Sequence, residues 1–426
     1  MQIICPYFQF FGHFLFFLSL RYAIIITEEK NRWEEKCMKK QLSIVFTGDI
    51  GFDNYMDGRW NDKDLLSQSI LDFIRSADHV VANVEGAMIE QERAEDATGK
   101  GRMFHTMNPE AIAFLKLINA DIWNLANNHA MDAGRGGIEN TIAMAKSMGS
   151  LTIGGGLNLP DAGEPVILDG AGGVGITACG YLPSCIPATD TEAGVRPWDS
   201  LESIGESIRK IKEKCRWAVL VVHGGEEFSS IPAPYTRELY HKYLELGADI
   251  VVGHHPHVPM NYETVGNKII FYSLGNFIFD TDYQRAQFNT DTGILLKLNF
   301  TEDSFSYEPL GFDIVRGSEV LVESKPADIF EDIGDEEYGK LINMAAKAFL
   351  CNERRRAVNL MGKAEEDFTK ADFEKFCSTF GKIEYVPGRH HDLNIYTELA
   401  DKADEKVFES SSLEKVKDYI LKQINN

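Results

Sequence analysis

The chain has 426 residues, of which 44% are hydrophobic and 25% charged, so it can bury a large core and carry an additional region. Its formal net charge of −22 argues against a basic face that binds nucleic acid. An anionic substrate stays open, because a bound metal ion reverses the local charge. The seven cysteines are scattered and never form C-x-x-C, which argues against a thiolate zinc cage or a disulfide framework.

Residues 1–37 form an N-terminal segment with two interpretations. The uncharged, aromatic-rich stretch 3–20 is just long enough to span a membrane, and the expected anchor is placed at residues 3–26. Basic residues follow it, so the positive-inside rule would leave the body on the cytoplasmic side. Alternatively, translation starts at Met38, because the codons for residues 33–35 can contain a ribosome-binding sequence. Residues 1–37 would then be a mis-called leader of a cytoplasmic protein, and a membrane would be a partner only under the first interpretation.

The body, residues 38–320, alternates apolar runs with amphipathic stretches. Residues 42–49, 78–86 and 120–129 read as strands that run into polar loops, with helices expected at 111–120 and 136–149. Further strands are expected in 217–225, 248–258 and 268–279, the second of them after a helix at 237–247. This alternation predicts a layered α/β fold.

Residues 321–426 differ in character from the body. Amphipathic helical patterns occupy 335–350, 370–380 and 412–425, so we expect a helical C-terminal appendage that covers part of the core. The run Arg354–Arg356 is interpreted as a solvated helix face, with an anion contact as the alternative.

Polar residues stand where the apolar strands of the body end. In an α/β sheet such positions meet in the crevice at the carboxyl ends of the strands. Each residue alone is an ordinary turn, cap or core-edge residue, but together they favour a site at one sheet edge. The set comprises Asp49, Glu85, Asn128, His129, His223, His254, His255 and His257.

Oxygen and imidazole ligands without thiolates suit divalent ions such as Mn, Fe or Zn, and we expect one or two ions. His255 and His257, separated by Pro256, could point toward two ions. Such a pair of ions lowers the pKa of a bridging water and neutralises charge on a phosphoryl or carbonyl oxygen. His129 could protonate a leaving group, with its ring oriented by Asp132.

Six motifs between residues 42 and 311 resemble those of CapA-type capsule-synthesis proteins in the calcineurin-like metallophosphoesterase superfamily. The third and fifth form a highly specific pair, whereas the short first two are weak individually. The six are F-T-G-D (46–49), A-N-V-E-G (82–86), L-A-N-N-H-A-M-D-A-G (125–134), H-G-G-E-E-F (223–228), G-H-H-P-H-V (253–258) and F-Y-S-L-G-N-F (271–277).

The resemblance implies a four-layer α-β-β-α sandwich with a dimetal site along one sheet edge. By this resemblance Asp49 and His257 would hold one ion, and Asn128, His223 and His255 the other. Glu85 takes the place of the bridging carboxylate, and His129 that of the leaving-group acid. The residues expected to contact substrate, or to orient those that do, are Glu227, His254, Asn83 and Asn276.

Two departures from the superfamily pattern bear on activity. The first motif lacks the histidine of D-x-H, because Gly51 follows Asp49 at that spacing, which puts one metal site and phosphodiesterase activity in doubt. The usual H-W-G-x-E-Y is H-G-G-E-E-F here, so the aromatic wall of the pocket is expected to differ. Loops 91–106 and 183–199 are expected to form the remaining pocket walls.

These observations lead to two hypotheses of function. The first is a metal-dependent hydrolase or transferase that acts on an anionic polymer, or on its phosphorylated precursor, in capsule or cell-surface biosynthesis. The second is a non-catalytic accessory protein, metal-binding or metal-free, for assembly or export of a polymer such as poly-γ-glutamate. Other capsule-biosynthesis proteins are expected partners under either hypothesis, and nucleic acid is not.

Overall fold

The computed structural model describes residues 40–89, 105–181, 186–380 and 393–425. The predicted anchor or leader at residues 1–37 lies outside these ranges, so both of its interpretations stay predictions. Within the described ranges, no helix combines the length and the apolar character needed to cross a membrane.

One mixed sheet contains the first strand of the body. Strand β1 pairs in parallel with β2 and β15 and antiparallel with β16, and β2, β5 and β6 continue the parallel part. Its strands are ordered β18-β17-β16-β1-β2-β5-β6, with β15 beside β1. Their bounds are β1 (Gln41–Ile50), β2 (His79–Val84), β5 (Ile122–Asn124), β6 (Leu151–Ile153), β15 (Asn276–Ile278), β16 (Thr292–Thr301), β17 (Phe305–Val315) and β18 (Val320–Ser324).

A second mixed sheet has the order β13-β14-β12-β11-β9-β8. Its central strands β9, β11, β12 and β14 are parallel, and the two edge strands are antiparallel to their neighbours. Its bounds are β8 (Val166–Leu168), β9 (Val174–Gly180), β11 (Trp217–His223), β12 (Ile250–His254), β13 (Tyr262–Val265) and β14 (Lys268–Phe271). Two small ribbons pair β3 (Ala87–Met88) with β4 (Thr106–Met107) and β7 (Gly155–Gly156) with β10 (Gly194–Val195).

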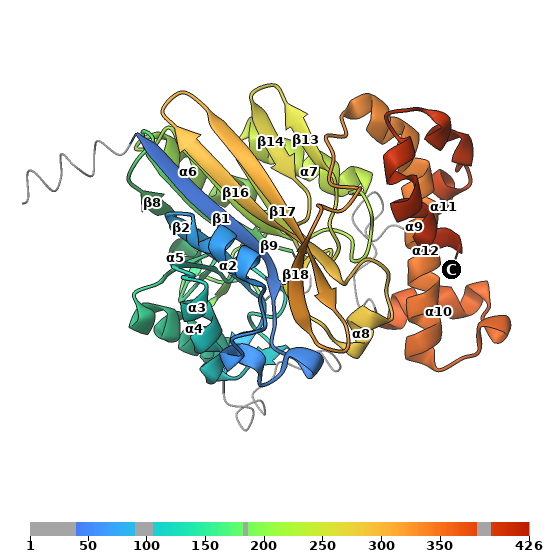
Figure 1. Cartoon of the computed structure of the whole chain (residues 1–426), viewed down its shortest axis with the longest axis horizontal. Helices are drawn as coiled ribbons and strands as arrows, with labels where there is room; N and C mark the ends of the chain where they lie inside the picture. Colours follow the sequence, from blue (N-terminus) through green and yellow to red (C-terminus); the bar gives the residue numbers. More distant parts are fainter. Residues whose placement is uncertain (1–39, 90–104, 182–185, 381–392, 426) are drawn as a thin grey trace, which may run out of the picture.

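Most of the helices lie beside the sheets, as Figure 1 shows. The helices of the body are α2 (Gln68–Arg75), α3 (Ile112–Leu117), α4 (Gly134–Met148), α5 (Leu159–Gly163), α6 (Leu201–Lys212), α7 (Pro234–Glu245) and α8 (Asp282–Arg285). Short 3-10 turns are η1 (Asn54–Met56), η2 (Arg59–Asn61), η4 (Pro109–Ala111), η5 (Glu365–Asp367), η6 (Glu405–Glu409) and η7 (Glu414–Val416).

The alternating residues of β1 enter different apolar clusters. Ile44 and Phe46 pack in a core that also contains Val221 and Val252 of the second sheet. Val45 points the other way, into a cluster formed with α2 and α3. This period-2 division is the ordinary geometry of a strand buried on both faces. A third cluster joins the second sheet to α6 and α7, so the predicted α/β class is confirmed.

Helices α9 (Asp335–Met361), α10 (Lys370–Phe380), α11 (Leu393–Ala400) and α12 (Lys417–Asn425) gather at one end of the molecule (Figure 1). The helical patterns expected after residue 320 are thus confirmed within the described ranges. The predicted boundary at 320, however, falls on the first residue of β18, which pairs antiparallel with β17 as the edge strand of the first sheet. The sheet therefore extends past the expected boundary.

Two helix ends show how local sequence sets the fold. Asn108 accepts a hydrogen bond from the Glu110 backbone N–H and caps the short turn before α3, with Pro109 in the first position. Gly149 ends α4 with a φ of 79°, a left-handed conformation that glycine adopts without steric cost. Both ends agree with the sequence-based expectation.

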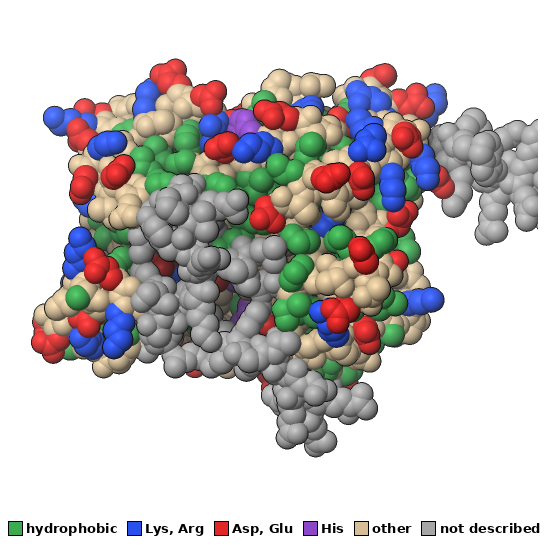
Figure 2. Space-filling view, turned by 180° about the vertical axis from the view of Figure 1, so that it is seen from behind, with side chains coloured by type: hydrophobic (Ala, Val, Ile, Leu, Met, Phe, Trp, Pro, Cys, Tyr) green, Lys and Arg blue, Asp and Glu red, His purple; other side chains and the backbone are tan. Residues whose placement is uncertain are grey.

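Charged side chains of both signs are interspersed on the face drawn in Figure 2. Among the described side chains of that face, Lys and Arg lie between Asp and Glu rather than in one continuous patch. Long-range attraction of a polyanion to this face would therefore be weak.

Candidate metal and catalytic site

The polar strand ends of both sheets meet at one place. Asp49 lies near the end of β1 and Glu85 follows β2, both in the first sheet, whereas His223 ends β11 in the second sheet. His255 and His257 follow β12 in that second sheet. We call Asp49, Glu85, His223, His255 and His257 the carboxylate–imidazole cluster. All five are buried.

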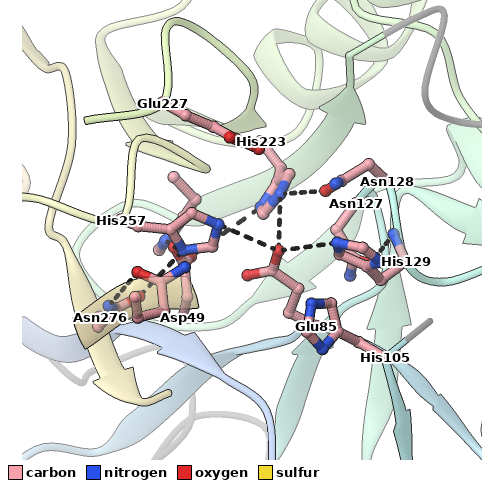
Figure 3. Close-up of polar contacts among 12 residues, drawn as sticks. Asp49, Glu85, His105, Asn127, Asn128, His129, His223, Glu227, His257 and Asn276 are labelled. Atoms are coloured by element: carbon pink, nitrogen blue, oxygen red, sulfur yellow. Dashed lines mark hydrogen bonds and ion pairs between the residues drawn. The ribbon is translucent and has the colours of Figure 1, made fainter. Parts of the chain in front are cut away.

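Glu85 is the centre of this cluster. Its Oε1 lies 3.5 Å from His223 Nε2, 3.8 Å from His257 Nε2 and 4.0 Å from His129 Nε2. Figure 3 shows these three contacts converging on the one carboxylate. Three imidazoles around one carboxylate correspond to the bridging position that the resemblance implied for Glu85.

Asp49 contacts imidazoles of the second sheet. Its Oδ2 lies 3.2 Å from His257 Nδ1, and its Oδ1 lies 3.4 Å from His254 Nδ1. Asn83, the register partner of Asp49 on β2, donates to Oδ1 at 2.7 Å. Burial would raise the pKa of Asp49, but the nearby His254 and His257 outweigh it and lower that pKa well below its usual range.

In the turn after β12, His255 and His257 have an unusual backbone conformation. His255 has a φ of 93° and His257 a φ of 60°, a region that residues other than glycine rarely adopt. Such conformations cost on the order of 1–3 kcal/mol each and persist where the surrounding structure holds them. Both rings lie near Glu85 in the cluster, and His257 Nδ1 contacts Asn276 Oδ1 at 2.9 Å.

Burial and charge divide the titratable groups of the cluster into two kinds. Burial lowers the pKa of His223 and of His255 to about 3, which keeps both imidazoles neutral with a lone pair available. Burial and the charge of Asp49 raise the pKa of Glu85 to about 8. Burial opposes a charge on His257, but Glu85 and Asp49 outweigh it and raise that pKa to about 9.

Several buried polar atoms of the cluster have no hydrogen-bond partner among the described residues. They are Asp49 Oδ2, both carboxylate oxygens of Glu85 and His255 Nδ1. A buried polar atom without a partner costs about 1–3 kcal/mol. Carboxylate oxygens and neutral imidazole nitrogens in this state fit a divalent cation, because they are the donor types that such ions take.

Two sets of donor atoms lie close enough to hold an ion. Glu85, His255 and His257 form one set, and Asp49, Glu85 and His223 form the other, with the donor atoms of each within 4.8 Å of one another. Glu85 belongs to both, as a bridging carboxylate would. The division of the histidines differs from the one implied by the resemblance, which paired Asp49 with His257 and His223 with His255.

The predicted acid and its orienting carboxylate are adjacent. His129 Nδ1 lies 2.6 Å from Asp132 Oδ2, a contact that orients the ring, whereas the catalytic role of the two residues stays a prediction. This contact turns His129 Nε2 toward Glu85 (Figure 3). Asn128 Oδ1 lies 2.8 Å from His223 Nε2, which places the amide beside the cluster. Asn127 supports the same loop, donating to the Val84 carbonyl and accepting from the His129 N–H.

The two asparagines that were expected to contact substrate, Asn83 and Asn276, contact residues of the cluster. Asn83 donates to Asp49 and accepts from Asn124. Asn276 contacts His257 through Oδ1 and donates through Nδ2 to Gln284 and to the Thr290 carbonyl. Both amides are buried, and their contacts orient Asp49 and His257, whereas the substrate contact of the two asparagines stays a prediction.

Glu227 contacts the C-terminal helix α9. Its Oε2 accepts from Arg356 Nη2 at 2.7 Å and from the Tyr283 hydroxyl at 3.1 Å. Burial would raise the pKa of Glu227, but Arg356 outweighs it, and with His255 and His257 nearby the pKa falls to about 2. Arg356 was expected on a solvated helix face. The structure corrects this for Arg356, whose side chain is 15% exposed, and for the half-buried Arg355, whereas Arg354 is exposed.

His105 is a site residue that the sequence did not single out. Its ring lies edge-on to His129 with ring centres 4.2 Å apart, and its Nδ1 lies 2.6 Å from Asp53 Oδ2. Its backbone N–H donates to Asp132 Oδ2, the same oxygen that contacts His129. Burial opposes a charge on His105, but the contact with Asp53 raises its pKa above the usual value. Its place in loop 91–106 was the one available signal.

An aromatic wall takes the place of the missing motif tryptophan. A side chain at Gly224 would collide with the ring of Trp198, at 2.6 Å from a Cβ, and with Tyr181. Tyr181 in turn lies 5.9 Å from His255 between ring centres. Tyr181 and Trp198 thus pack beside Gly224 and His255, and a role of loops 91–106 and 183–199 as pocket walls stays a prediction, because residues 91–104 and 183–185 lie outside the described ranges.

The fold and the cluster define a class: an α/β protein in which carboxylates and imidazoles, the residue types that ligate divalent metals, converge at the strand ends of two sheets. Comparison with known families agrees with this class and identifies one family within it. The chain belongs to the family of bacterial capsule synthesis proteins (PGA_cap), whose profile matches residues 43–281, more than half of its length. The CapA resemblance is thereby confirmed.

Curated relatives carry related names. The chain is 32% identical over 265 residues to the PGA biosynthesis protein CapA of Bacillus subtilis (strain 168), covering 61% of this chain and 69% of that protein. It is 27% identical over 266 residues to the capsule biosynthesis protein CapA of Bacillus anthracis, covering 61% and 63%. A probable polyglutamine synthesis accessory protein of Mycobacterium tuberculosis is 25% identical, covering 41% and 50%. The chain therefore spans one half to about two thirds of these proteins.

Among solved structures, a crystal structure of TT1561 of Thermus thermophilus aligns with 63% of this chain and 98% of its own. The TM-score is 0.34 and the identity 9%, and a similarity of this size supports no inference about fold or function.

Proposed function

We propose that this protein is a metal-dependent hydrolase or transferase of the CapA type that acts on an anionic polymer, or its phosphorylated precursor, in capsule or cell-surface biosynthesis. The observation that carries the proposal is that three buried carboxylate oxygens, Asp49 Oδ2 and both of Glu85, have no hydrogen-bond partner among the described residues and lie near imidazoles. The names of the Bacillus relatives support the biosynthetic setting. We also propose that the two sheets and their outer helices form the predicted four-layer α-β-β-α sandwich.

The carboxylate–imidazole cluster would hold one or two divalent ions, with Mn, Fe and Zn as candidates. When bound, the ions would supply an activated water and stabilise charge on a phosphoryl or carbonyl oxygen. His129 would give a proton to a leaving group from Nε2, and the contact of its Nδ1 with Asp132 supports this role. Asn83 and Asn276 hold Asp49 and His257 in position, and Glu227 and His254 stand beside the cluster.

The test compares purified, metal-loaded wild type with His129→Ala on phosphoesters and on γ-glutamyl amides. The proposal expects turnover of one bond type, lost in His129→Ala while metal content and folding persist. His79→Ala is the matched control, because His79 lies at the opposite end of β2 from Glu85. If the metal-loaded wild type cleaves neither bond type, the proposed enzymatic function is contradicted.

A second candidate function is a non-catalytic accessory protein for polymer assembly or export. It is favoured by the missing D-x-H histidine and by the name of the Mycobacterium tuberculosis relative. Under this hypothesis, His129→Ala leaves polymer output unchanged in cells, whereas an enzyme would lose that output.

A further inference from the structure

Helix α9 reaches the candidate site from outside the matched region, which ends at residue 281. Its Arg356 donates to Glu227, and the exposed fractions of the two side chains are 15% and 18%. An ion pair this well shielded is screened less by salt and solvent than a surface pair. The pair links a C-terminal helix to the loop that follows β11.

Both terminal nitrogens of the Arg356 guanidinium contact protein carboxylates, whereas its Nε has no hydrogen-bond partner among the described residues. One terminal nitrogen contacts Glu227 and the other contacts Glu353, one turn earlier on the same helix. Its central carbon also lies 5.4 Å from the ring centres of Phe228 and Tyr283. With both terminal nitrogens occupied by carboxylates, Arg356 is not placed to bind an anionic substrate, so its effect on the site passes through Glu227.

The backbone next to Glu227 is also held by the C-terminal helices. Phe228 has a φ of 62°, a left-handed conformation that is unfavourable for residues other than glycine. Its carbonyl accepts from Asn352 Nδ2 of α9 at 3.0 Å and from Gln423 Nε2 of α12 at 3.1 Å. The same Gln423 accepts from the Ser230 hydroxyl at 2.9 Å. Two donors on one carbonyl fix the loop at its strained residue.

Apolar contacts cover the rest of the loop. Ile231 packs in a cluster with Leu341 of α9 and Ile420 of α12. Ala233 packs with Phe349. On the other side of the loop, the ring of Phe228 lies 6.0 Å from that of His257 between centres. The loop 224–233 is therefore packed between the C-terminal helices and the carboxylate–imidazole cluster.

We propose that helices α9 and α12 are part of the candidate site, with Arg356 as a positioning residue that holds Glu227 beside His255 and His257. The loop-holding part of this inference stands on the contacts above, and its effect on metal binding rests on the function proposed for the cluster. The chain would then need its C-terminal region for the local geometry of the site as well as for overall stability.

The experiment uses the full chain and two readouts, hydrogen exchange of the amides in 224–233 and the dissociation constant of Mn²⁺ by calorimetry. The variants are Arg356→Met, the milder Arg356→Lys, Glu227→Gln/Arg356→Met, and Arg354→Met as the control on the exposed face of the same helix. Arg356→Lys keeps the charge and loses the forked geometry, so it remains informative if Arg356→Met does not fold.

Arg356→Met should speed exchange in 224–233 by about tenfold, with a smaller increase in Arg356→Lys and none in Arg354→Met. It should also tighten Mn²⁺ binding several-fold, because a cation near the cluster is removed while Glu227 stays negative. Removing both charges should return the affinity to near the wild-type value. A purely structural role for Arg356 would not give a tightening that disappears when Glu227 is neutralised as well.

Exchange in Arg356→Met equal to that in Arg354→Met would overturn the proposal. Faster exchange with an unchanged Mn²⁺ affinity would also overturn it, because the loop would then not hold Glu227 against the cluster. If Mn²⁺ binds to no variant, wild type included, the proposed metal-dependent function fails. The exchange result alone then decides whether Arg356 holds the loop.

Discussion

Replacing Glu85 by glutamine should have opposite effects on stability with and without metal. In the metal-free chain, burial and Asp49 raise the pKa of Glu85 to about 8, against an ordinary value of 4.5. The folded state then holds a proton that the unfolded chain releases. Its contribution to stability is therefore full below pH 4.5 and is lost as the pH rises toward about 8.

The difference between the two pKa values corresponds to about 5 kcal/mol at most, at 1.36 kcal/mol for each pH unit. Glutamine has the shape of the neutral carboxyl and no charge to bury. In a chelator, Glu85→Gln should therefore raise the free energy of unfolding by about 2–5 kcal/mol at pH 8.5 and change it little at pH 5. With Mn²⁺ present at pH 8.5 the order should reverse, because an amide is a poorer bridging ligand than a carboxylate.

Urea unfolding at the two pH values, with chelator or with Mn²⁺, measures these differences. Glu302→Gln, in the exposed turn between β16 and β17, is the matched control and should change stability little in any condition. A Glu85→Gln protein that is less stable than wild type at pH 8.5 in chelator would refute the reasoning, because it would mean that the buried Glu85 charge does not destabilise the folded state.

Three further predictions concern the acid, the strand contact beneath the cluster and the aromatic wall. His129→Ala should lower turnover by about 10²–10⁴-fold at unchanged metal content, and equal turnover in the variant would contradict its role. Gly48→Ala should lower the free energy of unfolding by about 3 kcal/mol or more in thermal unfolding, because a Cβ there would lie 2.2 Å from the Gly275 carbonyl oxygen. The control Gly136→Ala in α4, where a Cβ would have open space, should not lower it. Trp198→Ala should cost about 3–5 kcal/mol, and a cost below about 1 kcal/mol would show that the wall is not packed as described.

The sequence predicted the α/β class and the meeting of the cluster because both follow from local patterns. A buried strand that ends in a polar residue places that residue at a sheet edge, whichever sheet it joins. Asp49, Glu85, His223 and His257 could therefore be brought together before the sheets were known. The α4 helix and its Gly149 end followed from periodicity and capping in the same way.

The residues that the sequence missed or misjudged depend on long-range packing. Arg356 and Glu227 are 129 positions apart, and no periodicity reports which loop a helix will cover. His105 lies in a loop, where no periodic pattern marks the residues that face a site. The contacts of the Asn276 amide with Gln284, Thr290 and His257 could not be predicted either, because they depend on how distant segments pack in the folded chain.

The most direct test of the account is the metal content of protein purified without chelator, measured by elemental analysis on wild type, His255→Ala/His257→Ala and the control His79→Ala. The account predicts about one or two ions per chain in wild type and in the control, and near none in the double variant. A well-folded wild type that takes up no ion after resupply with Mn, Fe and Zn would contradict the claim that the cluster binds metal. The accessory function would then be favoured.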